Sequence, residues 1–208
     1  PHRIVIKKAL GADVRFLKGA GHWASKVDPV MPLYNEMTNP QAAPEPKAAT
    51  APVWVKQDYQ EFKSTDASIN KTLNPVTIGI VEKNYGWESG TVNADLGGGM
   101  HDNTVAYMEK IGVEHVVYDP FNRTDEYNQS SVAKIRDGKA DTVTINNTLN
   151  VVKEPELRKQ LLLEAENALK PGGKLYIQIY EGDKTGTGRH TKGDIWQENR
   201  KAADFLTE

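Results

Sequence analysis

The second half of the chain alternates between two patterns of hydrophobic and polar residues. Short runs rich in Val, Ile and Leu, typical of strands, alternate with longer segments in which apolar residues recur every three or four positions, as they do in helices. The predicted strands are Thr91–Leu96, His115–Asp119, Asp141–Asn147 and Lys174–Tyr180. The predicted helices are Asn103–Ile111, Asp125–Ile135, Glu154–Leu169 and Asp194–Leu206.

This strand–helix–strand repetition with short connections predicts the fold class. Right-handed crossovers of this kind build a mostly parallel sheet that helices cover on both faces, so we predict a doubly wound α/β domain. Upstream, Tyr59–Leu73 predicts a further helix that ends at Asn74-Pro75. The segment Val76–Lys83 is compatible with a helix or a strand, because its apolar positions fit both periods.

The N-terminal part of the chain has a different character. Residues 39–53 contain four prolines and five alanines, a composition that predicts a semi-extended linker. They separate a small basic extension, residues 1–38, from the main domain at residues 54–208. The extension holds two β-like runs, Arg3–Lys8 and Val14–Lys18, and is too small to have a core of its own.

Composition excludes several classes of protein. Charged residues make up 26% of the 208 residues, and no apolar run is long enough for a transmembrane helix. No apolar segment typical of a signal peptide is present either, so we expect a cytoplasmic protein without membrane contact. The absence of cysteine excludes disulfides, thiolate zinc sites and cysteine nucleophiles, and no H-x-x-x-H pair points to a metal.

The charge is unevenly distributed. Residues 1–26 carry six Lys or Arg against one Asp, a net charge of +5, while the whole chain carries −2, which leaves −7 for the remainder. A basic arm of this kind can contact the phosphates of a nucleic acid, or it can be a solvated tail. The basic segment 184–200, which includes Trp196, is either a substrate lid, a nucleic-acid contact or a surface loop.

A glycine-rich turn follows the first predicted strand of the main domain, in the run Asp95–His101 (DLGGGMH). Glycines allow positive φ and close approach of a ligand to the backbone, and the helix that follows presents free N–H groups. Asp119 ends the next strand, twenty residues after Gly99, where a carboxylate can accept hydrogen bonds from both ribose hydroxyls. Alternatively, Asp119 caps Asn122 or the next helix. The pattern predicts a nucleoside-containing ligand at the carboxyl ends of the strands.

The turn does not fit a dinucleotide. Asp102 stands where the G-x-G-x-x-G pattern requires its third glycine, and Asp95 at the start of the turn would repel a pyrophosphate. A carboxylate at that place suits a cationic ligand, such as one that carries a sulfonium and an amino group.

These features resemble class I S-adenosylmethionine-dependent methyltransferases over about residues 91–183. The run Asp95-Leu96-Gly97-Gly98-Gly99 is similar to the first motif of that family, and Asp119 to its ribose-binding acid. Asp141–Val151 resembles its fourth-strand motif, and Leu169–Leu175 the turn into its fifth strand. The resemblance implies a Rossmann-like fold, S-adenosylmethionine as cofactor, methyl transfer, and no requirement for a metal.

Three departures from the family pattern stand out. His101 occupies the position of its third glycine, and its third strand is not evident between Asp119 and Asp141. The chain ends at Glu208, before the family's sixth and seventh strands. We therefore expect either a fragment or a compact variant whose sheet the N-terminal β-like runs complete.

The resemblance also implies site residues. Those expected to bind the cofactor are Asp95, Gly97, Gly98, Gly99, Asp119, Asn146 and Asn147. The two asparagines would bind the methionine end or the substrate, or else anchor the loop. The candidate catalytic residues are His101, as a general base, Asn147, and Glu181, as a base or orienting group. The alternative for His101 is a solvated or capping side chain, and for Glu181 a loop cap.

The sequence leaves the methyl acceptor open between a small molecule and a nucleic acid. Enzymes that methylate exocyclic base amines usually carry [D/N/S]-P-P-[Y/F] after the fourth strand, whereas this chain has Asn146-Asn147-Thr148-Leu149, which favours a small molecule. The basic arm and the linker favour work near nucleic acid, in a protein of phage or mobile-element type. Two other functions stay open: a non-catalytic S-adenosylmethionine-binding assembly module, and an enzyme that cleaves S-adenosylmethionine.

Overall fold

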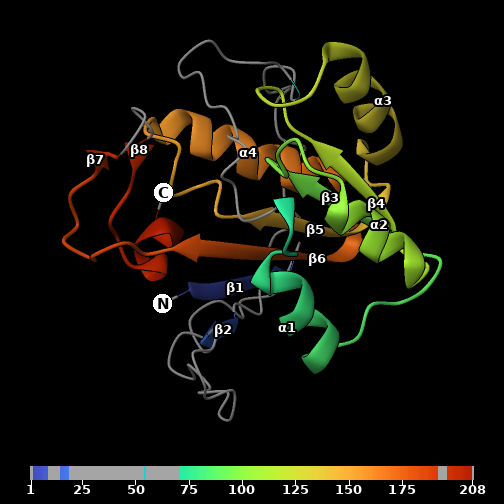
Figure 1. The fold of residues 1–208 in the computed structure, drawn as a ribbon, viewed down its shortest axis with the longest axis horizontal. Helices are drawn as coiled ribbons and strands as arrows, with labels where there is room; N and C mark the ends of the chain where they lie inside the picture. Colours follow the sequence, from blue (N-terminus) through green and yellow to red (C-terminus); the bar gives the residue numbers. More distant parts are fainter. Residues whose placement is uncertain (1, 9–14, 19–53, 55–70, 192–195, 208) are drawn as a thin grey trace, which may run out of the picture.

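The computed structural model describes residues 2–8, 15–18, 54, 71–191 and 196–207. At its centre lies a parallel sheet of four strands in the order β4-β3-β5-β6 (Figure 1). These strands are β3 (Val92–Leu96), β4 (Glu114–Tyr118), β5 (Ala140–Asn146) and β6 (Leu169–Tyr180). The chain moves from β3 outward to β4 and then returns to the other side of β3, so the strand order reverses between β3 and β5. The predicted α/β, Rossmann-like architecture is confirmed at this level.

Two N-terminal strands extend the sheet on the β6 edge. β1 (His2–Lys8) pairs antiparallel with β6, and β2 (Arg15–Lys18) pairs antiparallel with β1. Both β-like runs expected from the sequence are therefore strands of the main sheet. The predicted linker at residues 39–53 and nearly all of the helix predicted at Tyr59–Leu73 lie outside the described residues, and the division into domains stays a prediction.

One helix, α1 (Val76–Asn84), precedes β3. The three helices that connect the parallel strands are α2 (Asn103–Lys110), α3 (Asp125–Ile135) and α4 (Pro155–Ala168). α3 begins at its predicted residue because the hydroxyl of Thr124 caps it, accepting a hydrogen bond from the Tyr127 N–H at 3.2 Å. The ambiguous segment Val76–Lys83 is a helix. Between β4 and β5 the chain forms α3 and no strand, so β4 is an edge of the sheet.

The two faces of the central sheet differ in chemistry. One face carries apolar residues that pack against α3 and α4, and the other carries buried polar residues on the side of α1 and α2 (Figure 1). The apolar face includes Ala94, Leu96, Val116, Tyr118, Val143, Ile145, Ile177 and Ile179. The polar face includes Asn93, Asp95, His115, Thr144, Asn146 and Gln178, none of them more than 6% exposed. None of the helices that the structure describes is both long and apolar enough to cross a membrane.

The prediction of a helix at Asp194–Leu206 is wrong. β8 (Trp196–Gln197) pairs instead with β7 (Arg189–His190), and only Ala202–Thr207 forms a 3-10 helix. Backbone contacts with distant segments decide this geometry: the Glu198 N–H, for example, donates to the Asn150 carbonyl at 2.7 Å. The other correction concerns β6, which begins at Leu169 and includes the predicted Pro-Gly-Gly turn as an irregularity in its pairing with β5.

Candidate functional site

The turn after β3 requires its glycines. Gly97 and Gly99 both have φ of 76°, in the left-handed region. A Cβ on Gly97 would lie 2.5 Å from the Thr148 methyl group, and one on Gly98 would lie 2.5 Å from Oδ2 of Asp95. The predicted turn is therefore present, and its backbone packs too closely for any side chain.

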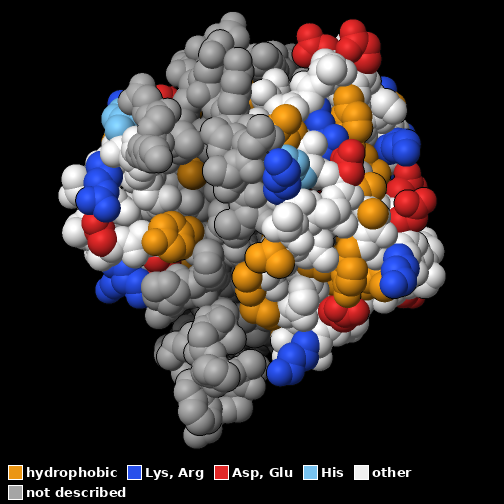
Figure 2. All heavy atoms as spheres, in the orientation of Figure 1, with side chains coloured by type: hydrophobic (Ala, Val, Ile, Leu, Met, Phe, Trp, Pro, Cys, Tyr) orange, Lys and Arg blue, Asp and Glu red, His pale blue; other side chains and the backbone are white. Residues whose placement is uncertain are grey.

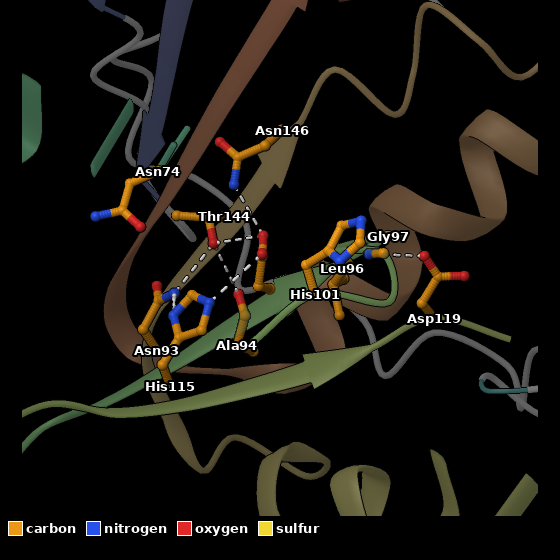
Figure 3. A network of polar contacts seen from close by, with 12 residues as sticks. Asn74, Asn93, Ala94, Leu96, Gly97, His101, His115, Asp119, Thr144 and Asn146 are labelled. Carbon is orange, nitrogen blue, oxygen red and sulfur yellow. Dashed lines mark hydrogen bonds and ion pairs between the residues drawn. The ribbon is translucent and has the colours of Figure 1, made fainter. Parts of the chain in front are cut away.

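Asp95 lies buried beneath this turn, at 2% exposure. Its Oδ1 accepts hydrogen bonds from the Thr144 hydroxyl and the Asn146 amide, both at 2.9 Å, and its Oδ2 lies 3.5 Å from Nε2 of His115 (Figure 3). Within the described part of the chain, no Lys or Arg forms an ion pair with this carboxylate. Its charge is therefore held by hydrogen bonds and an imidazole rather than by a permanent cation.

His115 is a member of the site that sequence reasoning missed. Asn93 lies opposite it in the parallel pairing of β3 and β4, and the Asn93 amide nitrogen lies 2.9 Å from Nδ1 of the ring (Figure 3). The same amide donates to the Thr144 hydroxyl at 3.0 Å. With Nδ1 accepting from Asn93, a neutral imidazole carries its proton on Nε2, toward Asp95. The signal in the sequence is a histidine in the interior of a strand next to the one that bears Asp95.

Asp119 lies at the end of β4, but its oxygens are already engaged. Oδ2 accepts the Gly99 N–H at 2.9 Å, and Oδ1 accepts the N–H groups of Phe121 and Asn122 at 3.0 Å each. The Asn122 side-chain amide reaches both oxygens at 3.0 Å. Burial raises the pKa of Asp119, and the hydrogen bonds offset this only in part. This is the capping arrangement that the sequence left open, and ribose binding stays a prediction that requires the Asn122 amide to move.

Asn146 is the last residue of β5, and Asn147 follows it directly. Oδ1 of each is a buried atom without a hydrogen-bond partner among the described residues. Asn147 has φ of 55°, and its N–H donates to the Gln178 carbonyl at 2.8 Å, which fixes the backbone there. Asn103, the first residue of α2, also has a buried Oδ1 without a partner in this part of the chain, and sequence reasoning missed it. Three acceptors thus lie unpaired on segments at the carboxyl ends of β3 and β5.

His101 lies beside the glycine turn (Figure 3), and its Nε2 is buried without a hydrogen-bond partner among the described residues. Arg123 holds this segment in place from the other side. Its Nε donates to the Gly99 carbonyl at 2.7 Å, and its Nη2 pairs with Asp102 at 2.7 Å. The imidazole of His101 is therefore positioned at the turn while one of its ring nitrogens remains available.

Glu181 does not join the glycine turn. It is fully buried, where it accepts the Ala202 N–H at 2.9 Å and pairs with Nζ of Lys184 at 3.1 Å. These contacts match the loop-capping alternative. As a consequence, the carboxylate ties the C-terminal segment to the end of β6.

In the described part of the C-terminal segment, several charged side chains pair with one another. Arg189 pairs with Asp183 at 3.4 Å and Arg200 with Glu198 at 3.3 Å. On the face drawn in Figure 2, basic and acidic side chains are interspersed rather than gathered by sign. Contact of this segment, or of the N-terminal arm, with nucleic acid stays a prediction.

The described residues bring no three acidic or imidazole groups together in a way that could hold a metal ion. Comparison with known proteins adds no name to this site: no protein-family model matches the chain, and no curated protein matches its sequence. The resemblance to methyltransferases rests on the motifs of the sequence.

Proposed function

We propose that this protein binds S-adenosylmethionine at the carboxyl ends of β3, β4 and β5 and transfers its methyl group to an acceptor. The observation that carries the proposal is the surplus of buried acceptors around the glycine turn. The amide oxygens of Asn103, Asn146 and Asn147 have no donor among the described residues, and Asp95 has no permanent cation. Each unpaired buried acceptor costs about 1–3 kcal/mol, so a ligand that brings donors and positive charge recovers this cost.

The methionine end of S-adenosylmethionine has this chemistry, because it carries an ammonium group and a sulfonium. Asn146 and Asn147 would bind this end, and Asp95 would supply the negative charge. When bound, S-adenosylmethionine supplies an electrophilic methyl group, so the chain needs mainly to align the acceptor. His101, with one free buried ring nitrogen beside the turn, is the group that would take a proton from an acceptor that carries one.

The test is a calorimetric titration with S-adenosylmethionine and S-adenosylhomocysteine. The informative variant is Asn147→Gly, because glycine accepts the left-handed backbone at this position and only the amide is lost. We expect saturable binding that weakens about tenfold in this variant, equivalent to about 1.4 kcal/mol. The control is Asn84→Ala, which removes an exposed amide that bonds only its own helix. Failure of the unmodified chain to bind either ligand would refute the proposal.

A binding module that does not transfer methyl is the second candidate. The observation that favours it is the engagement of Glu181, since that carboxylate is tied to Ala202 and Lys184 and is not available as a base at the turn. Product analysis separates the candidates. S-adenosylhomocysteine formed with small-molecule or nucleic-acid acceptors identifies transfer, other fragments identify cleavage, and binding without any product identifies the module.

A further inference from the structure

A cavity lies at the amino ends of the parallel strands, whereas the glycine turn lies at their carboxyl ends. Its volume is about 490 Å³, within the range of small-molecule sites. Thr91, Asp141 and residues 170–174 line it, which places it at the amino ends of β3, β5 and β6. The end of α1 and the residues that follow, Tyr85 to Glu88, form another wall. None of the candidate cofactor residues lines this cavity.

Three aromatic rings pack together in the wall of the cavity. The ring of Tyr176, at 2% exposure, lies 6.3 Å from that of Tyr85 and 6.0 Å from that of Trp87, measured between centroids. The indole N–H of Trp87 donates to the Ile78 carbonyl at 3.0 Å, which fixes this ring. Tyr85 is 37% exposed. A planar ligand can therefore pack on the exposed ring of Tyr85 beside the fixed ring of Trp87.

The charges of the cavity favour an anion at one side. Lys170 is neutralised by Asp141, with Nζ and Oδ1 2.7 Å apart. Lys174 has no ion pair with a described carboxylate, and its Nζ lies 5.8 Å from the centroid of the Tyr85 ring. Glu88 is the remaining acid of the lining and is exposed.

We propose that this cavity binds a nucleotide, with its base stacked on Tyr85 and Trp87 and its phosphate beside Lys174. A free mononucleotide and a nucleotide within a nucleic-acid chain present the same chemistry to these groups. The site is independent of the proposed methyl transfer, because it lies at the amino ends of the parallel strands and uses none of the residues at their carboxyl ends.

The test is a calorimetric titration of the full chain with AMP, in the presence of saturating S-adenosylhomocysteine to block any adenosine binding at the glycine turn. The variants are Lys174→Ala and Tyr85→Ala, whose side chains are exposed at the rim. The control is Lys134→Ala, another exposed lysine, which pairs with Glu114 and does not line the cavity. Circular dichroism melting curves check that each variant is folded.

We expect saturable AMP binding that weakens about tenfold in each rim variant and is unchanged in the control. Adenosine and inorganic phosphate alone should each bind more weakly than AMP. A short oligoadenylate identifies the source: tighter binding than AMP points to a nucleic-acid chain, and weaker binding to a free nucleotide. Absence of AMP and oligoadenylate binding up to about 1 mM, or AMP binding that neither rim variant changes, would overturn the proposal.

Discussion

Glu164 on α4 is a buried carboxylate whose removal has a calculable effect on stability. The side chain is 5% exposed, and its Oε1 accepts a hydrogen bond from the Gln160 amide at 3.4 Å. Burial raises the pKa of Glu164 from 4.5 to about 7, and the hydrogen bonds from Gln160 and the Trp54 backbone offset this only in part. The perturbation is Glu164→Gln, which keeps the shape of the side chain and removes its charge.

The sign follows from proton binding. Between pH 4.5 and about 7 the folded chain holds a proton on Glu164 that the unfolded chain has lost, so the free energy of unfolding falls as the pH rises through this window. At about 1.4 kcal/mol per pH unit, the folded state is about 3 kcal/mol less stable above this window than below it on account of this one group. Glu164→Gln should therefore be the more stable chain at high pH.

Urea unfolding of both chains at several pH values measures this effect. We expect the stability advantage of Glu164→Gln to grow by about 2–3 kcal/mol between about pH 5 and about pH 8. Taking the difference between the two chains cancels other titrating groups, including Asp119. Glu166→Gln, an exposed neighbour on the same helix, should show no such trend. An advantage that is independent of pH would refute the reasoning.

Three further predictions concern local geometry. Gly98→Ala should destabilise the fold by about 1–3 kcal/mol, because its Cβ would meet Oδ2 of Asp95. Gly79→Ala, in open space on α1, should instead stabilise the fold by about 0.5–1 kcal/mol, and thermal unfolding distinguishes the two variants. Thr124→Ala should cost about 1 kcal/mol in urea unfolding through loss of the α3 cap, and Thr124→Ser should restore it. Asn122→Ala should cost about 1 kcal/mol of stability without loss of S-adenosylmethionine affinity, because it frees acceptor sites on Asp119; a loss of affinity would contradict this.

The elements that could be predicted from sequence are those with a strong period and a clear end. α3 has its predicted bounds because Thr124 caps its start and Ile135, its last residue, is buried in the core. The prediction of a helix at Asp194–Leu206 failed because polar side chains of this segment form hydrogen bonds with distant segments. The Asn199 amide, for example, donates to the Thr187 carbonyl at 3.0 Å. Local periodicity contains no information about such contacts.

The same limit applies to the site. The sequence could predict that the glycine turn, Asp95 and Asn146 lie close together, because the carboxyl ends of parallel strands meet on the same side of a sheet. The approach of His115 to Asp95 depends on β3 and β4 being neighbours in the sheet, and the sequence does not state which strands pair. Glu181 follows a strand in the same way as Asn147, but its burial directs it to Ala202 instead.

The charge of Asp95 offers a direct test of the proposed ligand. Thr144, Asn146 and His115 fix its orientation, and no Lys or Arg of the described chain neutralises it. S-adenosylmethionine carries a sulfonium charge that S-adenosylhomocysteine lacks, while both carry the same ammonium group. Asp95→Asn removes the negative charge and keeps the size of the side chain.

In this variant we expect affinity for S-adenosylmethionine to fall about fivefold more than affinity for S-adenosylhomocysteine, a difference of about 1 kcal/mol for one charge interaction. Calorimetry with both ligands measures the ratio, and a melting curve checks the fold. Equal losses for the two ligands would assign Asp95 to the ammonium group, and unchanged affinity for both would remove it from the site. The ratio isolates the sulfonium because any general damage to the turn weakens both ligands alike.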